Sequence, residues 1–206
     1  SNNAWSCPIV IRVPVGGYIH GALCHSQSID GYFMHLPGIY IAYPSCAVDA
    51  KGLLKMACRM NDPVIFMEHK GLYRQNYAAT QEPDEEYILP FGKGRIINRG
   101  DELTLITWGA MVQKSLDAIR SLALSDGLIE VIDLRTLNPV DLHLIKTSII
   151  KTNKVLIVHE DNMTNGPGAE ISAIISDKFF ELLDGPIRRV AAKDSPVPFN
   201  WHIEEV

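Results

Sequence analysis

Along residues 1–67, apolar runs alternate with stretches in which apolar side chains recur every three or four positions. The runs are rich in β-branched and aromatic residues and are bounded by proline or glycine, which is typical of strands. Between them, Leu53, Leu54 and Ala57 follow helical spacing. The pattern predicts strands over residues 9–13, 39–43 and 64–67, and helices over residues 26–35 and 47–60.

A second alternating series begins at Gly92 and continues to about residue 191. Its strands are almost continuous runs of Val, Ile and Leu, and helical patterns separate them. Such strands indicate a parallel sheet with helices on both faces, which is the α/β class. The predicted strands are residues 95–97, 103–107, 128–134, 154–158 and 187–191, and the predicted helices are residues 111–124, 141–151 and 169–183.

The residues between the two series, 68–91, are polar, rich in turn formers and without clear periodicity. A connection of this length is uncommon inside a compact domain. It predicts an exposed interdomain linker, open to proteolysis, between two separately folded modules.

Composition excludes several classes of partner. The 206 residues are 47% hydrophobic, so the chain can bury one sizeable core or two small ones. Nineteen Lys and Arg stand against 24 Asp and Glu with no basic run, which disfavours nucleic acid and anionic membranes as partners. No apolar stretch approaches the roughly 20 residues of a membrane-spanning helix. Residues 1–4 also lack the features of a signal peptide.

The four cysteines, Cys7, Cys24, Cys46 and Cys58, form no CxxC pair. Their spacing favours ordinary buried thiols over a disulfide framework or a zinc site. The cysteines therefore predict a cytoplasmic protein without a metal centre.

The residues with the most chemical character surround His25, which follows a glycine-bearing loop and precedes a predicted helix. Strand ends that lead into helices are where α/β proteins place ligand groups. A helix N-terminus favours the neutral imidazole, which can exchange protons near pH 7. From these residues alone, a catalytic His25 and a structural loop histidine are equally well supported.

Two further segments have both a functional and a structural interpretation. Residues 159–161 (His-Glu-Asp) follow a buried strand, where they could form a site or a hydrogen-bonded cluster. Residues 166–168 (Gly-Pro-Gly) precede a helix and could offer N–H groups to an anion, although a tight loop is favoured. Sequence motifs of serine hydrolases, zinc proteases and P-loop proteins are absent. The remaining histidines have weaker cases; they are His20, His35, His69, His143 and His202.

A series of sequence blocks resembles the β subunits of pyruvate and branched-chain 2-oxo acid dehydrogenases. The blocks are HSQS (25–28), FMHLPG (33–38), YPS (43–45), DAKGLL (49–54), DPVIFMEHK (62–70), LYR (72–74), VIDLRTLNP (131–139), KT (151–152), VHE (158–160), GAEI (168–171) and DSPVP (194–198). Each block is weak evidence alone, but together they follow the family's order over almost the whole chain.

The resemblance implies two transketolase-like modules, both with mainly parallel sheets. Residues 1–80 correspond to the C-terminal part of the pyrimidine-binding domain, residues 81–91 to a linker and residues 92–206 to the transketolase C-terminal domain.

The same resemblance implies the decarboxylating component of a 2-oxo acid dehydrogenase complex. His25 matches the family's histidine that projects into the active site, with Ser26 and Gln27 near the substrate and the lipoyl arm. The reaction is the oxidative decarboxylation of a 2-oxo acid, either of the 2-oxoisovalerate type or pyruvate, with acyl transfer to lipoyl. The implied cofactor is thiamine diphosphate, with Mg²⁺ held by a partner α subunit or α-like half. The other implied partners are a second β copy and a dihydrolipoyl acyltransferase core.

The match to the family begins after its cofactor-activating glutamate, and no glutamate precedes Glu68 here. The chain is therefore expected to be a fragment that is inactive alone, and no metal ligand is assigned to it. A transketolase or a deoxyxylulose-phosphate synthase remains an alternative enzyme, and a non-catalytic assembly module an alternative role. A flavodoxin-like domain would explain the alternation of strands and helices, but none of the ordered blocks.

Overall fold

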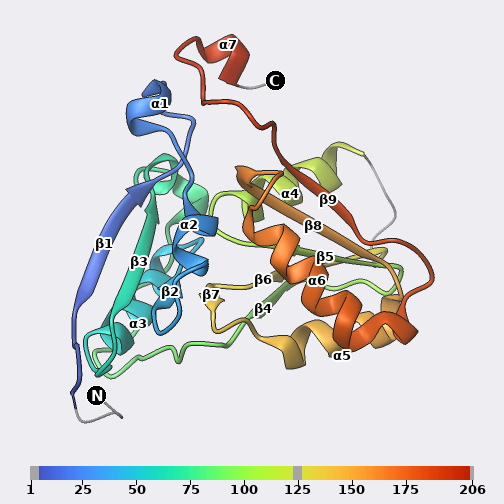
Figure 1. Ribbon diagram of the computed structural model, residues 1–206, viewed down its shortest axis with the longest axis horizontal. Helices are drawn as coiled ribbons and strands as arrows, with labels where there is room; N and C mark the ends of the chain where they lie inside the picture. The colour runs from blue at the N-terminus through green and yellow to red at the C-terminus, as the bar shows by residue number, and fades with distance from the viewer. Residues whose placement is uncertain (1–4, 123–126, 205–206) are drawn as a thin grey trace.

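The computed structural model describes residues 5–122 and 127–204 as two β-sheets with helices packed around them (Figure 1). The first sheet has the strand order β1-β3-β2-β7, and the second has the order β4-β6-β5-β8-β9. The strands are β1 (Val10–Val15), β2 (Tyr40–Ala42), β3 (Val64–His69), β4 (Arg95–Asn98), β5 (Leu103–Thr107), β6 (Ile129–Asp133), β7 (Thr136–Asn138), β8 (Val155–Asn162) and β9 (Arg188–Ala192). The helices are α1 (Ala22–His25), α2 (Asp30–Met34), α3 (Ala47–Ala57), α4 (Met111–Ser121), α5 (Leu142–Thr152), α6 (Pro167–Phe179) and α7 (Trp201–Glu204), with the short 3-10 helices η1 (Lys70–Leu72), η2 (Asn76–Ala78) and η3 (Phe180–Leu182).

Both sheets are mainly parallel. In the first, β1, β3 and β2 run in the same direction, and in the second so do β6, β5, β8 and β9. Only the edge strands β7 and β4 pair antiparallel to their neighbours within the described residues. The predicted α/β class with mainly parallel sheets is confirmed, as expected for strands whose Val and Ile runs are buried on both faces.

Side chains of β3 alternate between two different environments, because successive residues of a strand point to opposite faces. Ile65 and Met67 join a core that the first sheet shares with the second. Phe66 points the other way and packs with Leu53 of α3 and with Leu89. The first sheet therefore has α3 on one face and the second sheet's module on the other.

The shared core joins the two sheets into one packed unit. Buried Met67 of the first sheet belongs to the same cluster as Ile106, Ile132 and Ile157 of the second. The short strand β7, which no sequence pattern predicted, follows β6 in the chain but pairs with β2 of the first sheet. These contacts do not support separately folded modules, while the residue bounds of the two domains stay a prediction.

The connecting segment lies against α3 rather than free in solvent. Leu89 is 8% exposed, and its N–H donates to the carbonyl of Gly52 at 3.1 Å. Lys51 of the same helix binds Glu82 at 2.9 Å. The predicted linker, residues 81–91, therefore covers the outer side of helix α3 with its polar residues. Its apolar Leu89 is buried against this helix.

The predicted helix over residues 26–35 is wrong, because the chain forms two short helices, α1 and α2, and residues 26–29 between them are not helical. The Ser26 hydroxyl turns back to accept the N–H of Gly21 at 2.9 Å. The carbonyl of Gln27 accepts the N–H of Gly16 at 3.1 Å. Both contacts hold residues 26–29 away from helical geometry, and a local periodicity cannot reveal them.

Three smaller expectations also need correction. Residues 159–161 do not follow a strand but lie inside β8, which continues through Asn162. The helix predicted over 169–183 ends at Phe179 and gives way to η3. The helix predicted over 111–124 is α4, which ends at Ser121, and residues 123–126 lie outside the described residues.

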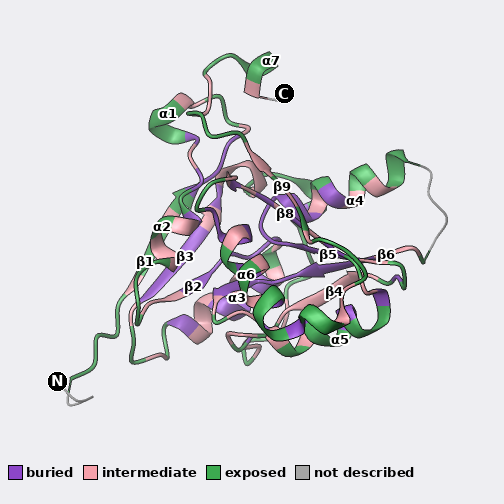
Figure 2. Ribbon diagram, turned by 45° about the vertical axis from the view of Figure 1, so that its right-hand side comes forward, coloured by how far each residue is buried: buried purple, intermediate pink, exposed green. Residues whose placement is uncertain are grey.

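The cysteines are free, as expected, but they are not the buried thiols that the sequence predicts. Cys7, Cys24 and Cys58 are exposed, and Cys46 is partly buried. No helix among the described residues combines the length and apolar character needed to cross a membrane. Figure 2 shows that burial is concentrated in the strands, whereas α1 and α7 stand at an exposed end of the molecule.

Candidate active site

The carboxyl ends of three parallel strands meet beside the segment that carries His25. β1 ends at Val15, β3 at His69 and β8 at Asn162. Residues 16–28, here called the His25 loop, follow β1 and contain α1, which extends beyond both sheets (Figure 1). Ligands of α/β proteins bind outside the carboxyl ends of the strands, so this is the expected place for a site.

Glu160 of β8 is the centre of the polar contacts at the base of this loop. One of its oxygens, Oε1, accepts the N–H of Gly17 at 2.6 Å and the Ser28 hydroxyl at 3.1 Å. The other, Oε2, lies 2.6 Å from Nε2 of His69. Burial opposes the charge on this carboxylate, but the hydrogen bond from His69 and its neighbours outweighs burial and lowers the pKa of Glu160.

His69 is buried, with a side chain that is 1% exposed. Its Nδ1 accepts the N–H of Gly71 at 3.1 Å. The ring proton is therefore on Nε2, which donates a hydrogen bond to Glu160. The ring of Tyr18 stacks on the imidazole with centroids 6.2 Å apart. His69 thus connects β3, the His25 loop and β8.

Two buried aspartates, Asp30 and Asp161, lie near His69 and Glu160. These four residues are here called the Glu160 cluster. Asp30 is fully buried and its Oδ2 accepts the indole N–H of Trp108 at 2.9 Å. Burial, followed by the charge of Asp161, raises the pKa of Asp30 to about 7. Asp161 accepts the N–H of Gly31 at 2.8 Å, and burial raises its pKa as well. The cluster therefore holds at least one group, Asp30, that changes protonation near neutral pH.

His159 does not join Glu160 and Asp161 in a common site. Its ring lies parallel to that of Trp108, with centroids 5.5 Å apart and an angle of 7°. Burial, then the charge of Arg189, lowers the pKa of His159 to about 4, so the ring is neutral at pH 7. A Cβ on Gly168 would lie 2.5 Å from this ring, so the residues 166–168 serve the close approach of α6 to His159. Of the two interpretations of residues 166–168, the structure therefore favours the tight loop over the anion site.

His25 is exposed, and it is the last residue of α1 rather than the first residue of a helix. The expected helix N-terminus is therefore not beside its imidazole. The ammonium of Lys70 donates to the carbonyl oxygen of His25 and connects the loop to the end of β3. The imidazole of His25 is thus exposed to solvent, while the backbone of His25 is restrained.

Ser26 and Gln27 lie on the inner side of the loop. Ser26 is fully buried and is committed to its bond with Gly21. Gln27 lines a cavity of about 430 Å³ together with the DSPVP block; the other lining residues are Asn162, Thr164, Asp194, Ser195 and Pro196. The cavity brings two distant sequence blocks, HSQS and DSPVP, to one place. The roles of Ser26 and Gln27 stay predictions.

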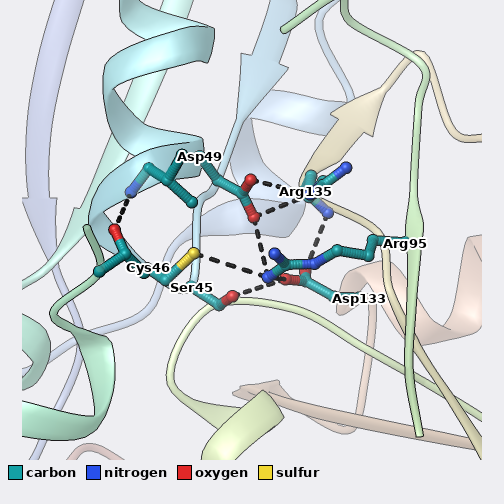
Figure 3. A network of polar contacts seen from close by, with 8 residues as sticks. Ser45, Cys46, Asp49, Arg95, Asp133 and Arg135 are labelled. Atoms are coloured by element: carbon teal, nitrogen blue, oxygen red, sulfur yellow. Dashed lines mark hydrogen bonds and ion pairs between the residues drawn. The ribbon is translucent and has the colours of Figure 1, made fainter. Parts of the chain in front are cut away.

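A second polar group joins the two sheets away from the His25 loop. It consists of Asp49, Arg95, Asp133 and Arg135, and is here called the Arg–Asp network (Figure 3). Asp49 of α3 is fully buried and accepts two hydrogen bonds from the guanidinium of Arg135, at 2.9 and 2.8 Å. Arg95 of β4 lies 3.1 Å from the same carboxylate.

The network also explains two of the sequence blocks. Asp49 comes from DAKGLL, whereas Asp133 and Arg135 come from VIDLRTLNP. The hydroxyl of Ser45 donates to Asp133 at 2.5 Å. Burial and the nearby charge of Asp49 raise the pKa of Asp133 to about 6, against the hydrogen bond from Ser45. The two blocks meet at the junction of the sheets and fix its geometry.

Comparisons with known proteins agree with this architecture. The family model "Transketolase, pyrimidine binding domain" matches residues 1–76, and the model "Transketolase, C-terminal domain" matches residues 92–206. A solved structure described as a split gene transketolase, inactive beta4 tetramer, superposes with a TM-score of 0.76 at 20% identity, covering 97% of this chain and 61% of that one. This structural similarity shows that the two proteins share a fold. The chain belongs to the transketolase family, with matches to its pyrimidine-binding and C-terminal domains.

Two curated relatives are similar to the chain over almost its whole length. The chain is 47% identical over 197 residues to the 2-oxoisovalerate dehydrogenase subunit beta of Bacillus subtilis (strain 168), covering 95% of this chain and 59% of the relative. It is 41% identical over 201 residues to the pyruvate dehydrogenase E1 component subunit beta of the same strain, covering 97% and 61%. The predicted resemblance is confirmed, and the chain spans about 60% of the length of these relatives.

Proposed function

We propose that this chain is part of the decarboxylating component of a 2-oxo acid dehydrogenase complex, acting on a branched-chain 2-oxo acid of the 2-oxoisovalerate type. The identity of 47% along 95% of the chain to a 2-oxoisovalerate dehydrogenase β subunit carries this proposal. Pyruvate is the second candidate substrate, because the pyruvate dehydrogenase β subunit follows at 41% identity. The proposed domains are residues 1–80 and 92–206 with a linker over 81–91.

The proposed cofactor is thiamine diphosphate, which when bound supplies the electron sink for decarboxylation. The residues described here do not fit its Mg²⁺-diphosphate end. Within 5–122 and 127–204, no group of three or more His, Cys, Asp or Glu is arranged to hold a metal ion. The carboxylates near the His25 loop are already bonded, since Asp30 binds Trp108 and Glu160 binds His69. The Mg²⁺-diphosphate site is therefore proposed for a partner α subunit or α-like half.

His25 is the proposed catalytic residue of this chain. Its side chain is exposed on a loop that is restrained at its base by Glu160 and Lys70. An imidazole held in this way can give or take a proton at the substrate without first ordering its backbone. Ser26 fixes the turn beside it, and Gln27 faces the 430 Å³ cavity, where an acyl or lipoyl group would fit.

The proposed partners are the α subunit, a second β copy and a dihydrolipoyl acyltransferase core, in the cytoplasm. Large apolar side chains near His25 support a partner at this end of the molecule. Leu23 of α1 is 61% exposed, and Ile203 of α7 is also 61% exposed. Contiguous apolar groups on a surface usually mark an interface.

An activity assay of the full-length protein, produced together with its α subunit, tests the proposal. Thiamine diphosphate and Mg²⁺ are added, and carbon dioxide release is measured from 2-oxoisovalerate and from pyruvate. We expect a higher kcat/KM for 2-oxoisovalerate. Ketol transfer between sugar phosphates without decarboxylation would instead show a transketolase, and an assembled complex with neither activity would show a non-catalytic module.

The isolated chain gives a second test. We expect calorimetric titration of residues 1–206 with thiamine diphosphate and Mg²⁺ to show no tight binding, because the proposed diphosphate clamp is on the partner. A dissociation constant in the micromolar range, about −8 kcal/mol, would contradict that placement.

A further inference from the structure

The first part of the His25 loop has an unusual backbone. Tyr18, His20 and Ala22 have φ angles of 62°, 57° and 51°, and Gly16 has a φ of 91°. Residues other than glycine rarely adopt the left-handed region, because their Cβ crowds the following carbonyl. Such conformations persist only where the surroundings restrain them, and they gather at functional sites. The restraints on this segment therefore determine where His25 lies.

Two carboxylates from the second module provide these restraints at adjacent peptides. The N–H of Gly17 donates to Oε1 of Glu160 at 2.6 Å. The next N–H, that of Tyr18, donates to Oε1 of Glu204 at 2.7 Å. Successive N–H groups that point to the same side form a concave anion-binding surface, which here is filled by the protein's own carboxylates.

Glu204 makes a further contact with the same loop. Its Oε2 lies 2.7 Å from Nδ1 of His20, so one side chain contacts the residues on both sides of Ile19. A Cβ on Gly17 would lie 3.1 Å from Glu204 and 3.4 Å from Glu160, which shows how closely the two carboxylates enclose this peptide. Lys114 of α4 stands over the ring of Tyr18, 3.7 Å from its centroid.

Burial distinguishes Glu204 from the rest of α7. Trp201 is 51% exposed and Ile203 is 61% exposed, whereas the side chain of Glu204 is 3% exposed. An apolar residue would normally be the one that anchors such a helix. Here the buried side chain is instead a carboxylate directed at the backbone of the His25 loop. Figure 1 shows the chain running from β9 to the end of the molecule where α1 lies.

We propose that Glu204 is a positioning residue, which clamps the His25 loop through the Tyr18 N–H and the His20 imidazole and thereby fixes the place of His25. The clamp joins residues 186 positions apart in the sequence. Its consequence for catalysis rests on the function proposed above, but the restraint of the loop does not. Glu204 is not proposed to contact the substrate.

Hydrogen exchange and steady-state kinetics test the proposal in the full-length protein with its α subunit. The variants are Glu204→Ala, Glu204→Gln and, as a matched control, Glu181→Ala, which removes an exposed glutamate in η3. We expect Glu204→Ala to raise the exchange rate of loop amides at residues 16–28 by about 10-fold or more, because local opening becomes easier. Peptides from β5, residues 103–107, should exchange as in the unchanged protein.

Glu204→Gln should restore much of the protection, since its amide oxygen can still accept the Tyr18 N–H. Glu204→Ala should lower kcat about 10-fold with little change in KM, because the substrate still binds while His25 is misplaced. Glu181→Ala should change neither measurement.

Three results would overturn the proposal: unchanged loop exchange in Glu204→Ala, equally faster exchange in the β5 peptides, or faster loop exchange with an unchanged kcat. If exchange responds as expected but the complex decarboxylates no 2-oxo acid, the clamp is supported and the proposed function fails instead.

Discussion

The Arg–Asp network and the Glu160 cluster join the same two modules, but they balance their charges differently. In the network, two aspartates meet two arginines, and Asp49 accepts three contacts from guanidinium groups. The cluster has three carboxyl groups, those of Asp30, Glu160 and Asp161, and the imidazole of His69 contacts only Glu160 among them. The network therefore pairs aspartates with arginines in equal number, whereas the cluster holds more carboxyl groups than basic partners.

This difference separates a structural junction from a candidate site. A buried group of matched charges fixes geometry, because removing one partner leaves another charge buried and unpaired. Burial raises the pKa of Asp30 in the cluster and also that of Asp133 in the network, so the place of each group in the fold also distinguishes their roles. The cluster also lies at the base of the His25 loop, whereas the network contacts α3, β4 and the β6–β7 turn.

The largest expected effect is a loss of stability when the Arg–Asp network is broken. Asp49→Ala should lower the free energy of unfolding by about 3–5 kcal/mol, because Arg135 would remain buried without its partner. Chemical denaturation measures this change. A double replacement, Asp49→Leu with Arg135→Met, should recover part of the loss, since apolar groups of similar volume can replace a buried pair. A loss below about 1 kcal/mol for Asp49→Ala would show that the junction does not depend on this network.

The next effect concerns activity rather than stability. In the full-length protein with its α subunit, His25→Ala should lower turnover of the 2-oxo acid by at least about 10²-fold. Thermal stability should hardly change, because the His25 side chain is exposed and packs in no core. His143→Ala, on the exposed face of α5, serves as the control and should change neither quantity. Normal turnover by the His25 variant would move the search for the site to the Glu160 cluster.

A pH series tests the excess of acid in the Glu160 cluster. The folded-state pKa of Asp30 is raised from 3.8 to about 7, so the folded protein binds more protons than the unfolded chain between these values. Stability from this group is therefore lost as the pH rises through that window. Asp30→Asn removes the titration and keeps an oxygen for the Trp108 N–H. Between pH 5 and pH 8 the variant should gain about 2–3 kcal/mol relative to the unchanged protein. A constant difference across this range would contradict the raised pKa.

The smallest effects come from two serines that compare the clusters directly. Ser45 donates to Asp133 at 2.5 Å and Ser28 donates to Glu160 at 3.1 Å, and both residues are 9% exposed. Ser45→Ala should cost about 2 kcal/mol, and Ser28→Ala about 1 kcal/mol, because Glu160 keeps its bonds from Gly17 and His69. Denaturation of both variants measures the difference. A larger loss for Ser28→Ala would reverse the comparison.

The sequence by itself determined the succession of strands and helices in both modules. The run over residues 103–107, Leu-Thr-Leu-Ile-Thr, became β5 with the same bounds, since a short run of apolar and β-branched residues indicates a strand without distant information. The ordered blocks also identified the family and pointed to His25. These features depend on local pattern, so they could be read without knowing which segments meet.

The tertiary structure decided which polar groups face each other. His69 and Glu160 are 91 positions apart, and Tyr18 and Glu204 are 186 apart, so no spacing in the sequence brings them together. The sequence suggested that His159 and Glu160 act together, but successive residues of a strand face opposite sides, and the His159 ring stacks on Trp108 instead. Strand β7 depends likewise on a partner far along the chain, because it pairs with β2. Long-range packing overrides local periodicity at these positions because the fold, not the spacing along the chain, sets which groups surround each side chain.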